Sequence, residues 1–168
     1  MASSDDTVRL KKYKTRGDRR HVQAQRIWML LVGSLLCYQK KHGRKNKAVI
    51  SEELPTYGEL ATLMGYSPQA GRTFAVAIGM LGWICVENDL PPINAVVVNQ
   101  HSRLPGDEVV LTGAPKTHAE WLAEVLSNQL DVLNYDWTRI RPPSTGMMLR
   151  IAKKHGMYAD EGDDSDES

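Results

Sequence analysis

The segment that decides the fold runs from Thr56 to Glu87 and reads TYGELATLMGYSPQAGRTFAVAIGMLGWICVE. It opens with a Thr-Tyr-Gly-Glu capping box, in which the threonine caps a helix and the glutamate reaches back to the cap. The first predicted helix covers residues 57–64 and ends at Gly65. Ser67 then caps a second helix, which begins with Pro68 and runs to Glu87. Two helices joined by a short glycine-containing turn are typical of a helix-turn-helix.

The region before this pair predicts one long helix. From Asp18 to His42, apolar residues recur at three- and four-residue steps, which is the period of an amphipathic helix, and Gly43 ends it. Residues 48–50 are a short strand candidate. The predicted inward positions are Val22, Ile27, Leu30, Leu31, Ser34, Leu35 and Tyr38.

The region after the pair changes period. Residues 93–98 are rich in β-branched side chains and predict a buried strand. A polar turn with a Pro-Gly pair follows, and residues 108–111 are expected to return as a partner strand. A β-hairpin directly behind a helix-turn-helix is a wing, whose tip would present His101 and Arg103.

The last third predicts further helix. A second capping box at Thr117–Glu120 opens a helix to about Leu133, and the pattern leaves open whether residues 145–155 form another. The fold class is therefore α+β and mainly helical, a winged helix-turn-helix with a long N-terminal and a C-terminal helix. We expect one domain at 18–155, a disordered basic arm at 1–17 and a disordered acidic tail at 156–168.

The charge is strongly segregated, although the net charge is only +1. Asp18 is the only acid between Val8 and Lys47, and the chain ends in DEGDDSDES. A basic front favours a polyanionic partner, the alternative being a solubilising face. The tail could compete for that front or only add solubility. The basic residues are Arg9, Lys11, Lys12, Lys14, Arg16, Arg19, Arg20, Arg26, Lys40, Lys41, Arg44, Lys45 and Lys47.

The residue pattern offers no reactive centre. The two cysteines, Cys37 and Cys85, lie in apolar runs and are expected to be buried, and the five histidines lack metal-ligand spacing. Glu52 and Glu53 are interpreted as surface charges. Phosphate-cradling and dinucleotide motifs are absent, so we expect no enzyme, no catalytic residue, no metal and no cofactor. An enzyme of unknown class using His101 or Arg103 is kept as a remote alternative.

The apolar runs predict no membrane crossing. The longest, residues 27–37, is about half the length that a membrane-spanning helix needs, and the charged start does not resemble a secretory signal. A cytoplasmic location is therefore expected.

Residues 56–79 and the run NDLPPINAVVV at 88–98 resemble the C-terminal winged-helix domain of the O6-alkylguanine-DNA alkyltransferases and the alkyltransferase-like proteins. The resemblance implies that Tyr57 acts at the phosphate of a flipped nucleotide, that Arg72 intercalates, and that Asn88 with Pro91 forms a hinge. In place of the family's Pro-Cys-His-Arg, this chain has Asn-Ala-Val-Val at 94–97. Alkyl transfer is excluded because the thiolate that would accept the alkyl group is missing.

The sequence thus predicts a bacterial or phage protein that binds DNA, or RNA, without catalysis. Affinity would come mostly from phosphate contacts by the arm and the wing. The alternative is a protein-interaction adaptor of phage or bacterial defence origin that forms a homodimer through the long first helix. The predicted nucleic-acid-binding residues are Tyr57, Gln69, Arg72, Thr73, His101, Arg103, Lys11, Lys12, Lys14, Arg19 and Arg20.

Overall fold

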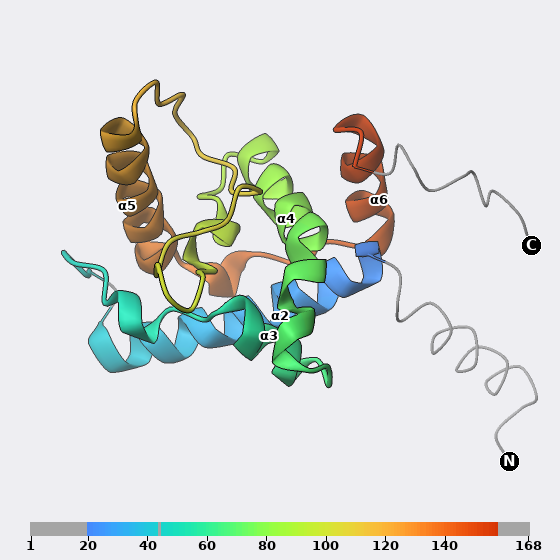
Figure 1. Cartoon of the computed structure of the whole chain (residues 1–168), viewed down its shortest axis with the longest axis horizontal. Coiled ribbons are helices and arrows are strands. Elements are labelled where there is room, and N and C mark those ends of the chain that lie inside the picture. The colour runs from blue at the N-terminus through green and yellow to red at the C-terminus, as the bar shows by residue number, and fades with distance from the viewer. Residues whose placement is uncertain (1–19, 44, 158–168) are drawn as a thin grey trace, which may run out of the picture.

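The computed structural model describes residues 20–43 and 45–157, and these residues are mainly helical (Figure 1). This confirms the mainly helical part of the predicted fold class. Residues 1–19, 44 and 158–168, which include all of the predicted basic arm and most of the predicted acidic tail, lie outside the described residues. The α-helices are α2 (Arg20–His42), α3 (Tyr57–Leu63), α4 (Ala75–Glu87), α5 (His118–Asn134) and α6 (Thr145–Lys154). Short 3-10 helices are η1 (Ser51–Glu53), η2 (Pro68–Phe74), η3 (Ile93–Val96) and η4 (Trp137–Arg139).

Helix α2 lies along one side of the core and packs against α4 and α6. Its buried stripe follows the predicted helical period but is rotated slightly, since Trp28 is buried while Leu30 is only partly so. Trp28 meets Trp137 edge to face, with ring centroids 5.7 Å apart. The indole N–H of Trp137 donates to the carbonyl of Val132 at 2.8 Å, so this large ring is buried without an unsatisfied donor.

The helix pair forms where the sequence predicts it. Both halves of the Thr56 capping box are present, and α3 starts at Tyr57. The second predicted helix is wrong in one respect: its first seven residues are the 3-10 helix η2, and α-helix begins only at Ala75. Gly71 permits this close packing, because a Cβ there would lie 2.6 Å from the carbonyl carbon of Tyr57.

The predicted strands at 48–50, 93–98 and 108–111 are not found among the described residues. The described residues contain an isolated parallel β-bridge, which joins Thr56 to Val98. Residues 93–96 turn as η3 instead, with Ile93 fully buried. The Ala95 carbonyl accepts from Gln129 Nε2 at 3.0 Å, and the Ala95 N–H donates to the Pro92 carbonyl at 3.0 Å. The β-branched run therefore fills a helical core rather than pairing in a sheet.

Helix α5 is attached to the body by its C-terminal half. The buried Gln39 of α2 donates through Nε2 to the carbonyls of Leu133 at 2.8 Å and Tyr135 at 2.7 Å. Farther up α5, Asn128 bonds with Thr112 of the preceding loop. The N-terminal half of α5 stands away from the helical body, beside this loop (Figure 1).

Residues 145–154, which the sequence left open, form α6 with Ser144 as its cap. Helix α6 packs on α2 and α4, and the described chain begins and ends at this side of the molecule (Figure 1). Gly156 and Met157, predicted to belong to the tail, instead close the helix, because Met157 N donates to the Ala152 carbonyl at 2.8 Å.

One expectation about the cysteines is wrong. Cys85 is buried as expected, but Cys37 is exposed because it lies outside the buried stripe of α2. Among the described residues, the segment Pro68–Glu87 is long and apolar enough to span a membrane by length and composition alone, and 56% of its most apolar window is buried inside the fold.

Candidate nucleic-acid interface

The outer edge of η2 carries the polar residues that the helix-turn-helix prediction singled out. Gln69, Arg72 and Thr73 are all exposed. Gln69 and Arg72 are three residues apart, and side chains at this spacing line up along a 3-10 helix. The Thr73 hydroxyl donates to the Ala70 carbonyl at 2.6 Å and is therefore committed to the backbone. Among the described residues, Arg72 has no ion-pair or hydrogen-bond partner, so its guanidinium is open to solvent.

Tyr57 lies at the start of α3, but its hydroxyl is already satisfied. It donates to a carboxylate oxygen of Glu108 and accepts from the backbone N–H of Gly106 at 2.9 Å. Burial, and then the hydrogen bond to Glu108, raise the pKa of the Tyr57 phenol above its usual range. The phenol is therefore neutral at ordinary pH, and its hydroxyl lies beside the Glu108 carboxylate.

Sequence reasoning missed Glu108 as a partner of Tyr57. The two residues are 51 positions apart, so no local pattern links them. The available signal was the Pro-Gly turn, which returns the chain towards the helix pair just before an acidic residue.

The positions that match the family's Pro-Cys-His-Arg are part of the core. Ala95, Val96 and Val97 have no exposed surface, and Asn94 is 1% exposed. Asn94 Nδ2 donates to the Glu108 carbonyl at 3.2 Å, and its side chain fills the space beside Gly82, where a Cβ would lie 2.5 Å from Nδ2. This region is closed, unlike an open acceptor site.

Arg103 serves the fold in this structure. Its guanidinium donates from Nε to the Ser51 carbonyl at 3.1 Å and from Nη2 to the Leu54 carbonyl at 2.9 Å. It thereby ties the 99–104 turn to η1, and its backbone adopts a positive φ of 56°. His101, on the same turn, is exposed. At the predicted wing tip, the Arg103 side chain is therefore bonded to backbone carbonyls, whereas the His101 side chain is exposed to solvent.

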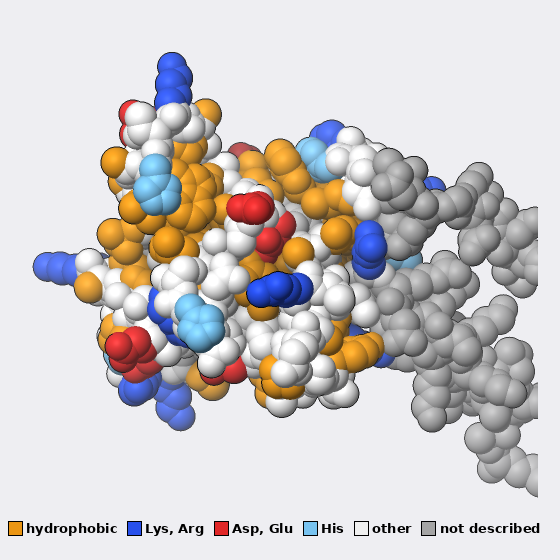
Figure 2. Space-filling view, in the orientation of Figure 1, with side chains coloured by type: hydrophobic (Ala, Val, Ile, Leu, Met, Phe, Trp, Pro, Cys, Tyr) orange, Lys and Arg blue, Asp and Glu red, His pale blue; other side chains and the backbone are white. Residues whose placement is uncertain are grey.

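The basic arm can be placed only by its point of attachment. Lys11, Lys12, Lys14 and Arg19 lie outside the described residues, and Arg20 is the first residue of α2. Within the described part, Lys and Arg only slightly outnumber Asp and Glu. On the face that Figure 2 shows, basic side chains are spread over the surface, and a few of them lie close together at the lower left.

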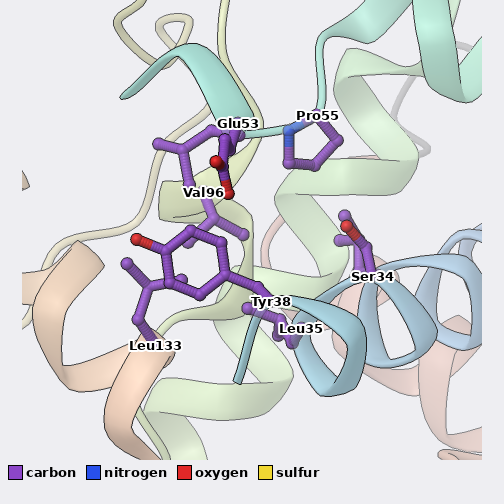
Figure 3. Close-up of a pocket in the computed structure, with 9 residues that line it drawn as sticks. Ser34, Leu35, Tyr38, Glu53, Pro55, Val96 and Leu133 are labelled. Carbon is purple, nitrogen blue, oxygen red and sulfur yellow. The ribbon is translucent and has the colours of Figure 1, made fainter. Parts of the chain in front are cut away.

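The pocket in Figure 3 lies between α2, the segment entering α3, and α5. Its volume, about 10 Å³, is about the space that one water molecule needs. The described residues also contain no cluster of three or more His, Cys, Asp or Glu side chains that could hold a metal ion. The lining residues are Leu31, Ser34, Leu35, Tyr38, Glu53, Leu54, Pro55, Val96 and Leu133.

Comparison with known proteins found no match: no family model, no curated protein and no solved structure matches this chain.

Proposed function

We propose that this protein binds nucleic acid, with DNA as the preferred partner, and that it does not catalyse a reaction on it. The observation that carries the proposal is the open edge of η2, where Arg72 and Gln69 stand side by side with Arg72 unpaired. Arginine and glutamine are the side chains that most often read guanine and adenine edges. One arginine cannot supply much affinity, so phosphate contacts by the basic residues near the N-terminus are expected to dominate.

In this proposal the scaffold works as a winged helix-turn-helix. The η2–α4 segment enters a groove, and the 99–111 segment takes the place of the wing, presenting His101. Tyr57 acts as a positioning residue that holds the 106–108 segment through Gly106 and Glu108. Its hydroxyl does not contact phosphate as long as Glu108 faces it.

Fluorescence anisotropy with a labelled duplex of about 25 base pairs, and with a single-stranded RNA of the same length, tests the proposal. We expect binding to the duplex whose affinity falls steeply with salt, because bound lysines and arginines release counterions from the phosphates. Absence of binding at low salt contradicts the proposal, and tighter binding to the RNA changes the substrate class.

The matched variants are Arg72→Ala and Arg150→Ala. Both arginines are exposed, but Arg150 lies on α6, away from η2. Loss of a base-contacting arginine is expected to weaken duplex binding roughly 10-fold, whereas Arg150→Ala changes it little. Equal effects of the two variants would show that the η2 edge is not the interface.

A second candidate function is a protein-interaction adaptor that self-associates through α2. The observation that favours it is the outward side of this helix, where Met29 is 58% exposed, Leu36 is 36% exposed and Cys37 is exposed. Analytical ultracentrifugation over a range of concentrations tests it, and a monomer at every concentration contradicts it.

A further inference from the structure

Two separate helices present apolar residues to solvent. The α2 face consists of Met29, Gly33, Leu36 and Cys37, spaced at helical steps. The α5 face consists of Leu122, Ala123 and Leu126, which are three and four residues apart. The α2 face is about two helical turns long and the α5 face a little over one turn, and both can pack against a helix.

Both faces are uncovered by the residues that the structure describes. Met29 is 58% exposed, and Leu122 and Leu126 are 37% and 49% exposed. A Cβ added at Gly33 would meet no atom within 4 Å, so the α2 face is flat at its centre and open to a neighbouring helix. In Figure 2, hydrophobic side chains gather at the α5 end of the molecule.

The two helices carry opposite charges. Arg26 and Lys40 flank the α2 face, and the helix Arg20–His42 contains no acid. On α5, Asp131 is exposed, the Glu120 carboxylate accepts from the backbone N–H of Thr117 in the capping box, and the helix His118–Asn134 contains no lysine or arginine. Two α2 faces placed together would oppose cations, and two α5 faces would oppose carboxylates. An α2 face against an α5 face pairs opposite charges in either helix direction.

We propose that the α2 face of one copy of this chain packs on the α5 face of a second copy. The contact is heterologous, since two different surfaces meet, and it forms either a closed ring or a chain of copies. The proposal deepens the second candidate function and replaces the symmetric α2–α2 pairing expected from the sequence. It does not involve Arg72, so its failure leaves the nucleic-acid proposal standing.

Cysteine cross-linking tests the contact directly. Cys37 lies on the α2 face and Cys85 is buried, so the unaltered chain has one accessible thiol among its described residues. The double variant Ala123→Cys/Cys37→Ser moves that thiol to the α5 face. The unaltered chain carrying a size tag is mixed with the double variant and oxidised mildly, and circular dichroism checks that both are folded.

The expected product is the mixed disulfide, formed at least 10-fold faster than either self-linked dimer. Dominant Cys37–Cys37 linkage would overturn the proposal in favour of α2–α2 pairing. Dominant linkage of the double variant to itself would overturn it in favour of α5–α5 pairing. Monomers by ultracentrifugation, with no product above the random rate, would show that neither face binds a second copy.

Charge reversal provides an independent test. Asp131→Lys should raise the dissociation constant of self-association about 10-fold, because it places a cation opposite the basic ends of the α2 face. If adding Arg26→Glu to Asp131→Lys restores the affinity of self-association, the two helices pack antiparallel. If adding Lys40→Glu restores it instead, they pack parallel. If neither reversal restores association in a folded chain, the proposed pairing is wrong.

Discussion

The helix pair at 57–87 and the loop at 99–111 each carry an arginine that the sequence offers as a nucleic-acid contact. The guanidinium of Arg103 is occupied by the carbonyls of Ser51 and Leu54. Arg72 is exposed and has no partner among the described residues. Two arginines of equal charge therefore differ in availability, and availability depends on the acceptors that the fold brings within reach.

Gly71→Ala is the strongest way to disturb the helix pair itself. The added methyl group would lie 2.6 Å from the Tyr57 backbone, and backbone cannot move aside cheaply. We expect a loss of about 3 kcal/mol in the free energy of unfolding, measured by urea denaturation. Gly33→Ala is the control, because its methyl group meets no atom within 4 Å. It should stabilise the protein by about 0.5–1 kcal/mol through helix propensity. Equal changes in the free energy of unfolding for Gly71→Ala and Gly33→Ala would contradict the close packing of η2 on α3.

Arg103→Ala compared with Arg72→Ala separates the two arginines. Removing Arg103 should lower the free energy of unfolding by about 2 kcal/mol, because charged donors to the Ser51 and Leu54 carbonyls are lost. Its effect on duplex affinity should be less than twofold. Arg72→Ala should show the reverse pattern, with stability unchanged and affinity reduced. If the Arg103→Ala protein is as stable as the unaltered chain but binds the duplex weakly, Arg103 and the 99–111 loop contact the nucleic acid.

Glu108→Gln tests whether nucleic acid binds near Tyr57, at the start of α3, or elsewhere. The amide can still bond the Tyr57 hydroxyl, so stability should change by less than about 1 kcal/mol. Removing a negative charge beside the helix pair should strengthen duplex binding about threefold at low salt. Anisotropy titrations at two salt concentrations measure it, with Asp89→Asn, an exposed residue beyond the C-terminal end of α4, as the control. Unchanged affinity would place bound nucleic acid away from Tyr57.

The smallest expected effect concerns the junction of α4 and α6. Glu87 accepts from Lys154 at 2.8 Å and from His155 at 2.7 Å, and the His155 ring stacks on Trp83. The hydrogen bond from Lys154, and then that from His155, lower the pKa of Glu87. A carboxyl whose pKa is lower in the folded state stabilises the fold above its unfolded pKa and loses that contribution as pH falls through the folded value.

Stability should therefore decline as pH falls below the ordinary carboxyl range, and Glu87→Gln should make this decline shallower. Thermal denaturation followed between pH 3 and pH 7 measures the slope. An identical slope in the variant would mean that these contacts contribute nothing to the acid sensitivity.

The sequence by itself determined the features that depend on residues close together in the chain. The capping boxes at Thr56 and Thr117 join residues three apart, and both helices start where the boxes predict. The long helix at 20–42 follows from its apolar period in the same way. The exposure of Gln69 and Arg72 also follows from helical position alone.

Only the tertiary structure decided how the intervening segments are used. A β-branched run such as 93–98 signals burial, and a sheet or a helical core satisfies that signal equally well. The bonds of Arg103 and of Tyr57 reach residues about 50 positions away, so they exist only after the core has packed. The physical reason is range: hydrogen bonds within one helical turn are set locally, whereas long-range partners depend on how the helices pack.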